Sequence, residues 1–132
     1  MRVTTMTLIL TLSAGSILAK PPLRDVAEID GPLFNVALAD EIRKQCPTID
    51  GRLAKGVKTL WDLKRRANAL GYSDAEIDAY RKSDAEKARL RAKGDSWLKA
   101  RGVNKTKTED WCRVGRDEIE KGSQIGGLLR QN

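Results

Sequence analysis

Histidine is absent from the 132-residue chain, and this absence excludes several kinds of active site at once. A Ser-His-Asp or Cys-His catalytic arrangement needs an imidazole, so neither can be built here. The only two cysteines, Cys46 and Cys112, cannot complete a tetrahedral zinc site by themselves. The chain also lacks a Walker-type phosphate loop and a dinucleotide fingerprint after a strand. We therefore expect no cofactor, no metal site and no enzymatic activity.

Aromatic residues are scarce at 5%, whereas charged residues make up 33% of the chain. This balance is typical of amphipathic helices around a modest core, and no alternating strand pattern extends beyond a few residues. The length indicates one domain, and a core of this size often needs a covalent or metal staple. We predict an all-α fold, a small bundle of four to five helices with one disulfide, after an N-terminal signal peptide.

Charge is missing altogether between residues 3 and 19. Met1 and Arg2 give a positive start, an apolar centre follows, and small residues occupy positions 13–16. This order is typical of a secretory signal peptide, and the run is too short and too rich in Thr and Ser for a good membrane anchor. We predict a signal peptide over residues 1–19, cleaved after Ala19, with cleavage after Gly15 as the alternative. The mature protein is then periplasmic or secreted and has no transmembrane segment.

Apolar residues at helical spacing predict five helices in the mature chain, over residues 32–45, 49–70, 74–82, 84–101 and 108–121. Pro21 and Pro22 predict an extended lead-in over residues 20–31, before a single helical domain over residues 32–132. Asp30 is the expected N-cap of the first helix, with Pro32 in its first turn. Capping boxes are expected at Ser73–Glu76, Ser83–Glu86 and Thr106–Glu109. The second helix carries an apolar stripe made of Ile49, Leu53, Val57, Leu60, Leu63, Ala67 and Leu70.

Cys46 extends the stripe of Phe34, Leu38 and Ile42 on the first helix, so it should face inward. Cys112 lies near the start of the last helix. Because an exported protein meets an oxidising compartment, two cysteines usually pair there. We predict a Cys46–Cys112 disulfide, with two free thiols or a shared metal site as the alternatives.

The charged residues offer two further hypotheses. The mature chain has a net charge of +6, since cleavage removes only Arg2 from a total of +7. Basic residues cluster at 64–66, at Arg89, Arg91, Lys93, Lys99 and Arg101, and at Lys105 and Lys107, which suggests a weak polyanion or nucleic-acid binder. Acids interrupt these clusters, so a solvated surface is the better interpretation, no nucleic acid is expected, and an anionic envelope surface is the more reasonable target.

Adjacent carboxylates occur at Asp40–Glu41 and Asp117–Glu118, but neighbouring helical residues point about 100° apart and do not face each other. Carboxylates from different helices could still converge in a cleft, as in a carboxylate-dependent enzyme acting on an envelope polymer. Glycines gather near the C-terminus at Gly115, Gly122, Gly126 and Gly127, where we expect close helix packing rather than a ligand.

Several segments resemble one family across nearly all of the mature chain. They are Lys20-Pro-Pro-Leu-Arg-Asp-Val, Ala39-Asp-Glu-Ile-Arg-Lys, Leu70-Gly-Tyr-Ser-Asp-Ala-Glu-Ile, Ser83-Asp-Ala-Glu-Lys-Ala-Arg and the stretch 112–130 with Lys121-Gly-Ser-Gln-Ile-Gly. The sequence is similar to an uncharacterised family of small exported proteins of Gram-negative bacteria, classed as a domain of unknown function. The resemblance implies no activity, but it implies that both cysteines belong to the family pattern. We expect a non-enzymatic binding or structural protein of the cell envelope, whose partner the sequence does not identify.

Overall fold

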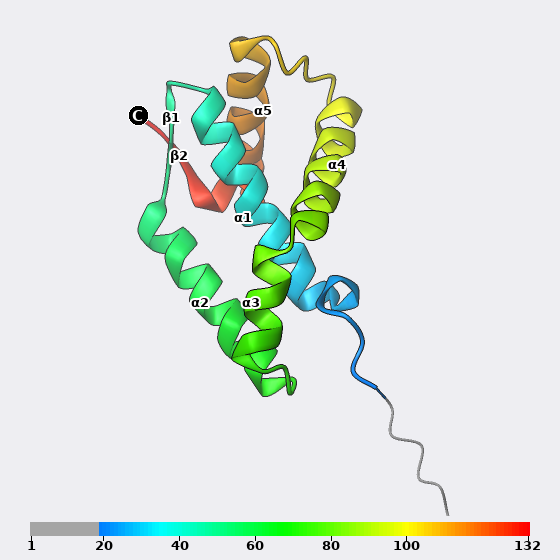
Figure 1. Ribbon diagram of the computed structural model, residues 1–132. Coiled ribbons are helices and arrows are strands. Elements are labelled where there is room, and N and C mark those ends of the chain that lie inside the picture. Colours follow the sequence, from blue (N-terminus) through cyan, green and yellow to red (C-terminus); the bar gives the residue numbers. More distant parts are fainter. Residues whose placement is uncertain (1–18) are drawn as a thin grey trace, which may run out of the picture.

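The structure is a computed structural model, and it describes residues 19–132 (Figure 1). The signal-peptide prediction lies outside the described residues, except for Ala19. The described elements are η1 (Leu23–Asp25), α1 (Ala27–Gln45), β1 (Ile49–Gly51), α2 (Leu53–Ala69), α3 (Asp74–Lys82), α4 (Asp84–Ala100), α5 (Thr108–Lys121), η2 (Gly126–Leu128) and β2 (Leu129–Gln131). The all-α prediction, with five helices in this part of the chain, is confirmed. None of the helices in residues 19–132 is both long and apolar enough to cross a membrane.

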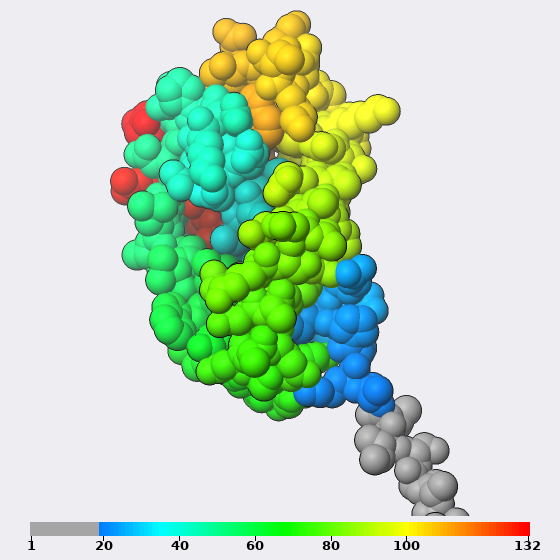
Figure 2. Space-filling view, in the orientation of Figure 1, coloured from blue at the N-terminus to red at the C-terminus, as the bar shows by residue number. Residues whose placement is uncertain are grey.

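Helix α1 occupies the centre of the molecule (Figure 1). It packs against α2 on one side and against α4 and α5 on the other. Figure 2 shows that α2, α3 and the residues before α1 form one end of the molecule, whereas the connection between α4 and α5 forms the other. The N-terminal part of α1 therefore contributes Ile29 to one apolar cluster, and the rest of the helix, from Phe34 onward, contributes to a second, larger one.

The larger cluster contains the disulfide. Phe34, Leu38 and Ile42 of α1 meet buried residues of α4, α5 and both strands there. Cys46 and Cys112 are joined in this cluster, and the Cys46 side chain is fully buried. The predicted disulfide is confirmed. It ties the end of α1 to the first turn of α5 across 66 positions of sequence.

The start of α1 differs from the prediction. The extended lead-in predicted for residues 20–31 is wrong in its second half, because η1 covers Leu23–Asp25 and α1 begins at Ala27. Asp30 is not an N-cap but a buried residue within α1, and Pro32 lies inside the helix. Burial of Ile29 against Ala67 and Tyr72, together with ion pairs to Asp30, offsets the backbone hydrogen bond that Pro32 removes.

Helix α2 also begins later than predicted. Ile49 does not start the helix but lies in β1, which pairs antiparallel with β2 in the register Ile49 to Gln131 and Gly51 to Leu129. Both Ile49 and Leu129 are buried in the larger cluster. Residues 49–51 are extended rather than helical, because they form hydrogen bonds with β2 and because this conformation buries Ile49 in the core.

Helices α3 and α5 have both predicted ends, and α4 ends one residue earlier than predicted. The capping box at Ser73–Glu76 is confirmed. Ser83 caps α4 through the Glu86 amide, but the Glu86 side chain turns to Arg24 and Arg89 instead of completing a box. The box expected at Thr106 is wrong, because Lys107 is the N-cap of α5 and no side chain caps it.

Glycine allows close packing of the C-terminal segment, as expected. A Cβ added at Gly126 would lie 1.9 Å from the Glu118 carbonyl oxygen, and one added at Gly115 would lie 2.5 Å from Ile49 Cδ1. Gly122 ends α5 in the left-handed conformation, with a φ of 62°. Gly126 therefore allows η2 to lie against the end of α5, and Gly115 allows α5 to lie against β1 and α1.

Candidate functional site

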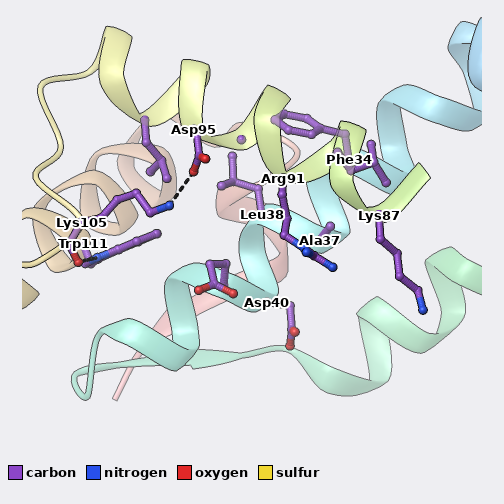
Figure 3. A pocket seen from close by; sticks show the side chains of 13 residues that line it. Phe34, Ala37, Leu38, Asp40, Lys87, Arg91, Asp95, Lys105 and Trp111 are labelled. Atoms are coloured by element: carbon purple, nitrogen blue, oxygen red, sulfur yellow. Dashed lines mark hydrogen bonds and ion pairs between the residues drawn. The ribbon is translucent and has the colours of Figure 1, made fainter. Parts of the chain in front are cut away.

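Two hollows in the described surface have extended apolar walls. The first, of about 370 Å³, lies between α1, α4 and the start of α5. Its apolar wall includes Phe34, Leu38, Leu98 and Trp111, and it includes the acids Asp40 and Glu41 of α1 and Asp95 of α4. Figure 3 shows Lys87 and Arg91 extending from α4 and Asp95 paired with Lys105.

Two of the three acids of this first hollow are held in ion pairs, and Glu41 accepts a hydrogen bond from the Gln45 amide. Asp40 lies 2.5 Å from Lys44 Nζ and 2.6 Å from Arg43 Nη2. Partial burial alone would raise the pKa of Asp40, but hydrogen bonds from Lys44 and Arg43 outweigh burial and lower it. Asp95 lies 2.6 Å from Lys105 Nζ. A glycosidase-type site needs one carboxyl with a raised pKa as its acid, and Asp40 is shifted in the opposite direction.

The other predicted carboxylate pair lies elsewhere. Glu118 is buried on α5 and lies within 4 Å of Arg101 and Lys121. Asp117 faces Arg113 on the same helix. Neither residue lines the hollow that contains Asp40 and Glu41. The two pairs therefore do not converge on one cleft.

A buried network of charges joins α1, α3 and α4. The Asp30 carboxylate accepts hydrogen bonds from Tyr80 Oη at 2.6 Å and from Arg89, and Lys93 Nζ lies 3.4 Å away. Arg89 also donates to Glu86 at 2.8 Å. Burial alone would raise the pKa of Asp30, but Arg89 and Tyr80 outweigh it and lower the pKa, while burial and Asp30 raise the pKa of Tyr80. Every member has a partner, so the network fixes the three helices in place.

The second hollow is an apolar groove of about 360 Å³ between α2 and α3. Leu23 and Ile29, each 5% exposed, line it together with Leu33 of α1. Val57, Leu60 and Trp61 form the α2 wall, and Ile77 and Tyr80 belong to the α3 wall. Lys64, Asp78 and Arg81 are its charged residues. We call this hollow the α2 groove.

The α2 wall of this groove is unusually exposed. The exposed fractions are 55% for Val57, 42% for Leu60 and 58% for Trp61, and Leu53, which lies one turn before the groove, is 64% exposed. Helix α3 has nine residues and α2 has 17, so at about 1.5 Å per residue α3 is roughly 12 Å too short to run alongside all of α2. Because α3 follows α2 after a tight turn, its shortness leaves the N-terminal half of α2 uncovered (Figure 1).

The basic clusters do not form one continuous basic surface. Lys64, Arg65 and Arg66 face different acids, namely Asp74, Asp62 and Glu28. Arg89 and Lys93 turn toward the buried Asp30. Arg101 lies over the Trp97 ring, with 3.6 Å to its centroid, and near Glu118. A polyanion would meet alternating charges, so the arrangement gives the polyanion hypothesis little support.

Sequence reasoning placed the α2 residues on one helical stripe but did not expect their exposure. The sequence contained one signal of this exposure, the difference in length between two consecutive helices. The helix predicted over residues 49–70 has 22 residues, and the next has nine, which is too few to cover it. The network around Asp30 was missed altogether, since its members are up to 63 positions apart.

Residues 21–130 match the model of a family described as "Family of unknown function (DUF5333)". No curated protein and no solved structure matches the chain. Within residues 19–132 no three cysteine, aspartate or glutamate side chains gather in an arrangement that could hold a metal ion.

Proposed function

Because the chain belongs to the DUF5333 family, whose function is unknown, we propose its function from the geometry. We propose that it is a small exported protein of the cell envelope, that it catalyses no reaction, and that it binds another protein through the α2 groove. The exposed apolar wall of α2 is the observation that carries this proposal.

The exposed apolar side chains are not spread over the surface. Among the described residues five large apolar side chains are exposed, and all belong to α2 or to the residue after it: Leu53, Val57, Leu60, Trp61 and Leu70. Contiguous exposed apolar surface on a small protein marks an interaction site more often than scattered apolar residues do. Four of the five residues form the exposed side of α2, and three of these line the groove.

Two features support export. Structural disulfides persist in oxidising compartments, and the Cys46–Cys112 bond lies in the main core. The charge-free run over residues 3–19 has the order of a signal peptide. The family resemblance of the sequence to exported proteins of Gram-negative bacteria points to the periplasm.

The absence of catalysis is supported by the state of the acids. The chain has no histidine, and Asp40 is stabilised in its ionised form by two cations. A hydrolase would need a free general acid or base, and the ion pairs of Asp40 and Asp95 occupy two of the three carboxylates of the first hollow, while the third, Glu41, accepts a hydrogen bond from Gln45.

A photo-crosslinking amino acid at position 60 tests the proposal in intact cells. Leu60 lines the groove, whereas Leu70 has the same exposed fraction of 42% and does not line it. We expect a discrete protein adduct from position 60 that is missing from position 70. Intact-mass analysis of the periplasmic fraction should find a chain that begins at Lys20. Equal adduct patterns at both positions, or a full-length cytoplasmic chain, contradict the proposal.

A further inference from the structure

We infer that the occupant of the α2 groove is an acidic amphipathic helix of another protein. This inference rests on the proposed function and names the chemistry of the partner. Three observations carry it: the shape of the groove, the spacing of its apolar residues and the charge around it.

The shape favours a helix. The groove is bounded by two antiparallel helices for part of its length and by α2 alone for the rest, because α3 is about eight residues shorter. Eight helical residues correspond to roughly 12 Å. An incoming helix of two or more turns would lie on the uncovered half of α2, next to the end of α3, and complete the layer that α3 begins.

The spacing of the α2 residues also favours a helix. Leu53, Val57 and Leu60 occupy positions i, i+4 and i+7, so their side chains lie in a row along one face of α2. Such a row forms a ridge that can pack between the side chains of another helix. Trp61 lies beside this ridge with 58% of its surface exposed. An aromatic anchor next to aliphatic residues is a common centre of helix-in-groove recognition.

The charge favours an acidic partner. Helix α2 carries five basic residues, Lys55, Lys58, Lys64, Arg65 and Arg66, against one acid, Asp62, which gives 5 − 1 = +4. At the groove itself Lys64 and Arg81 stand at opposite walls, and the lining contains one acid, Asp78. Lys64 pairs with Asp74 at 3.5 Å and Arg81 with Asp78 at 3.4 Å, both at exposed positions, so the lining keeps an excess of one positive charge. Carboxylates on the flanks of an incoming helix would be attracted by this potential.

The same charge and shape argue against two other occupants. A second copy of the chain would place two α2 helices of charge +4 against each other, which is repulsive. An anionic lipid surface would satisfy the charge, but it is flat on this scale and does not reach Ile29, which lines the groove and is 5% exposed. The test must therefore distinguish binding of a helix from binding of a second copy and from binding of a lipid surface.

The test is a titration of the ¹⁵N-labelled protein, followed by two-dimensional NMR. The probe is a designed peptide of about 16 residues, roughly 24 Å as a helix, with leucines on one face and glutamates elsewhere. A scrambled peptide of the same composition and vesicles with anionic headgroups are the comparisons. We expect saturable shifts of the Val57 and Leu60 amides with the amphipathic peptide, at least about tenfold weaker binding of the scrambled peptide, and binding that weakens as salt is added.

Matched variants assign the binding to the groove. Leu60→Gln should weaken binding by about tenfold, whereas Leu70→Gln should change it less than twofold, in line with the concentration of binding energy in a few central residues. The double variant Lys64→Gln/Arg81→Gln should lose most of the salt dependence. Its control, Lys87→Gln/Arg91→Gln, changes the same residue types beside the other hollow.

The outcomes separate the inference from the proposed function. Equal binding of both peptides, no binding at millimolar peptide, or binding of vesicles alone overturns the acidic helix. Concentration-dependent dimers in sedimentation that Leu60→Gln abolishes would identify a second copy as the occupant. If the crosslinks from position 60 persist in any of these cases, the groove still binds a protein and only its chemistry was misassigned. If those crosslinks are also missing, the proposed function itself fails.

Discussion

Breaking the Cys46–Cys112 disulfide should cost this protein a large part of its stability. The cleanest perturbation is reduction of the wild-type protein, because it breaks the bond without changing a residue. The double variant Cys46→Ala/Cys112→Ala provides an independent measurement. It also removes two buried sulfur atoms from the main core, so its loss should be somewhat larger.

The magnitude follows from the size of the closed loop. The two cysteines are 66 positions apart, and a loop of that length gives about 4 kcal/mol in the chain-entropy model. For a domain of roughly 110 residues the entropy of unfolding is about 0.23 kcal/mol per degree, so the expected decrease in Tm is about 17 °C. Helix content at low temperature should not change, because Ile42, Ile49 and Val114 keep α1 and α5 packed around the broken bond.

Thermal unfolding followed by circular dichroism measures the effect, with and without reductant. Reductant should leave the melting curve of the double alanine variant unchanged, which controls for effects other than the disulfide. Thiol titration of the unreduced protein should detect no free thiol. A decrease in Tm below about 5 °C on reduction would refute the reasoning, because it would mean that the loop is already restrained in the unfolded chain.

Three further predictions concern other parts of the molecule. Gly126→Ala should lower the free energy of unfolding by at least about 2 kcal/mol in urea denaturation, because its Cβ would collide with the Glu118 carbonyl. Gly31→Ala, where an added Cβ has no atom within 4 Å, should raise it by up to about 1 kcal/mol, and equal effects at the two sites would contradict the packing. Asp30→Asn should lower the free energy of unfolding by about 3 kcal/mol, since Arg89 is left with Glu86 as its buried carboxylate partner and Tyr80 loses its charged acceptor. The pKa of Asp30 is lower in the folded protein than in the unfolded chain, where it is near 3.8. The stabilisation by Asp30 is therefore present above the unfolded pKa and is lost as pH falls through the folded pKa. Urea denaturation from pH 7 to 2 should show this loss in the wild type, and an equal decline in the Asn variant would contradict it. Binding to a heparin column should be weak and disappear by roughly 150 mM salt, and retention at high salt would contradict the mixed charge pattern.

The sequence predicted those parts of the fold whose signals are local. Helix α3 begins at the residue after Ser73 because the hydroxyl of Ser73 and the carboxylate of Glu76 cap it within four residues of sequence. Helix α5 ends before Gly122 because that residue adopts a left-handed conformation. The start of α3 and the end of α5 could therefore be read without knowledge of neighbouring elements.

The errors arose where distant residues decide the local structure. Ile49 has the right spacing for α2, yet it pairs with Gln131, which is 82 positions later. Asp30 has the chemistry of an N-cap, yet its partners Tyr80 and Arg89 come from α3 and α4. Neither partner can be identified from a window of sequence around the residue.

The candidate site was within partial reach of the sequence. The apolar stripe of Leu53, Val57 and Leu60 was recognised, but helical periodicity cannot tell a buried face from an exposed one. Exposure depends on whether α3 is long enough to cover α2. The pairing of Arg89 and Lys93 with Asp30 was out of reach, because it depends on the packing of α1 against α4.

Strand β2 follows all five α-helices of residues 19–132, and this order has a consequence for folding. Leu129 lies in the main core and pairs with Gly51, while the Asn132 backbone amide donates to the Thr48 carbonyl. A ribosome adds roughly 5–20 residues per second, so several seconds separate the synthesis of β1 from that of its partner strand β2. Until residues 128–131 have been made, the larger cluster lacks Leu128 and Leu129 and stays incomplete. Deletion of residues 129–132 should leave the cluster in that state and make the protein more sensitive to proteolysis.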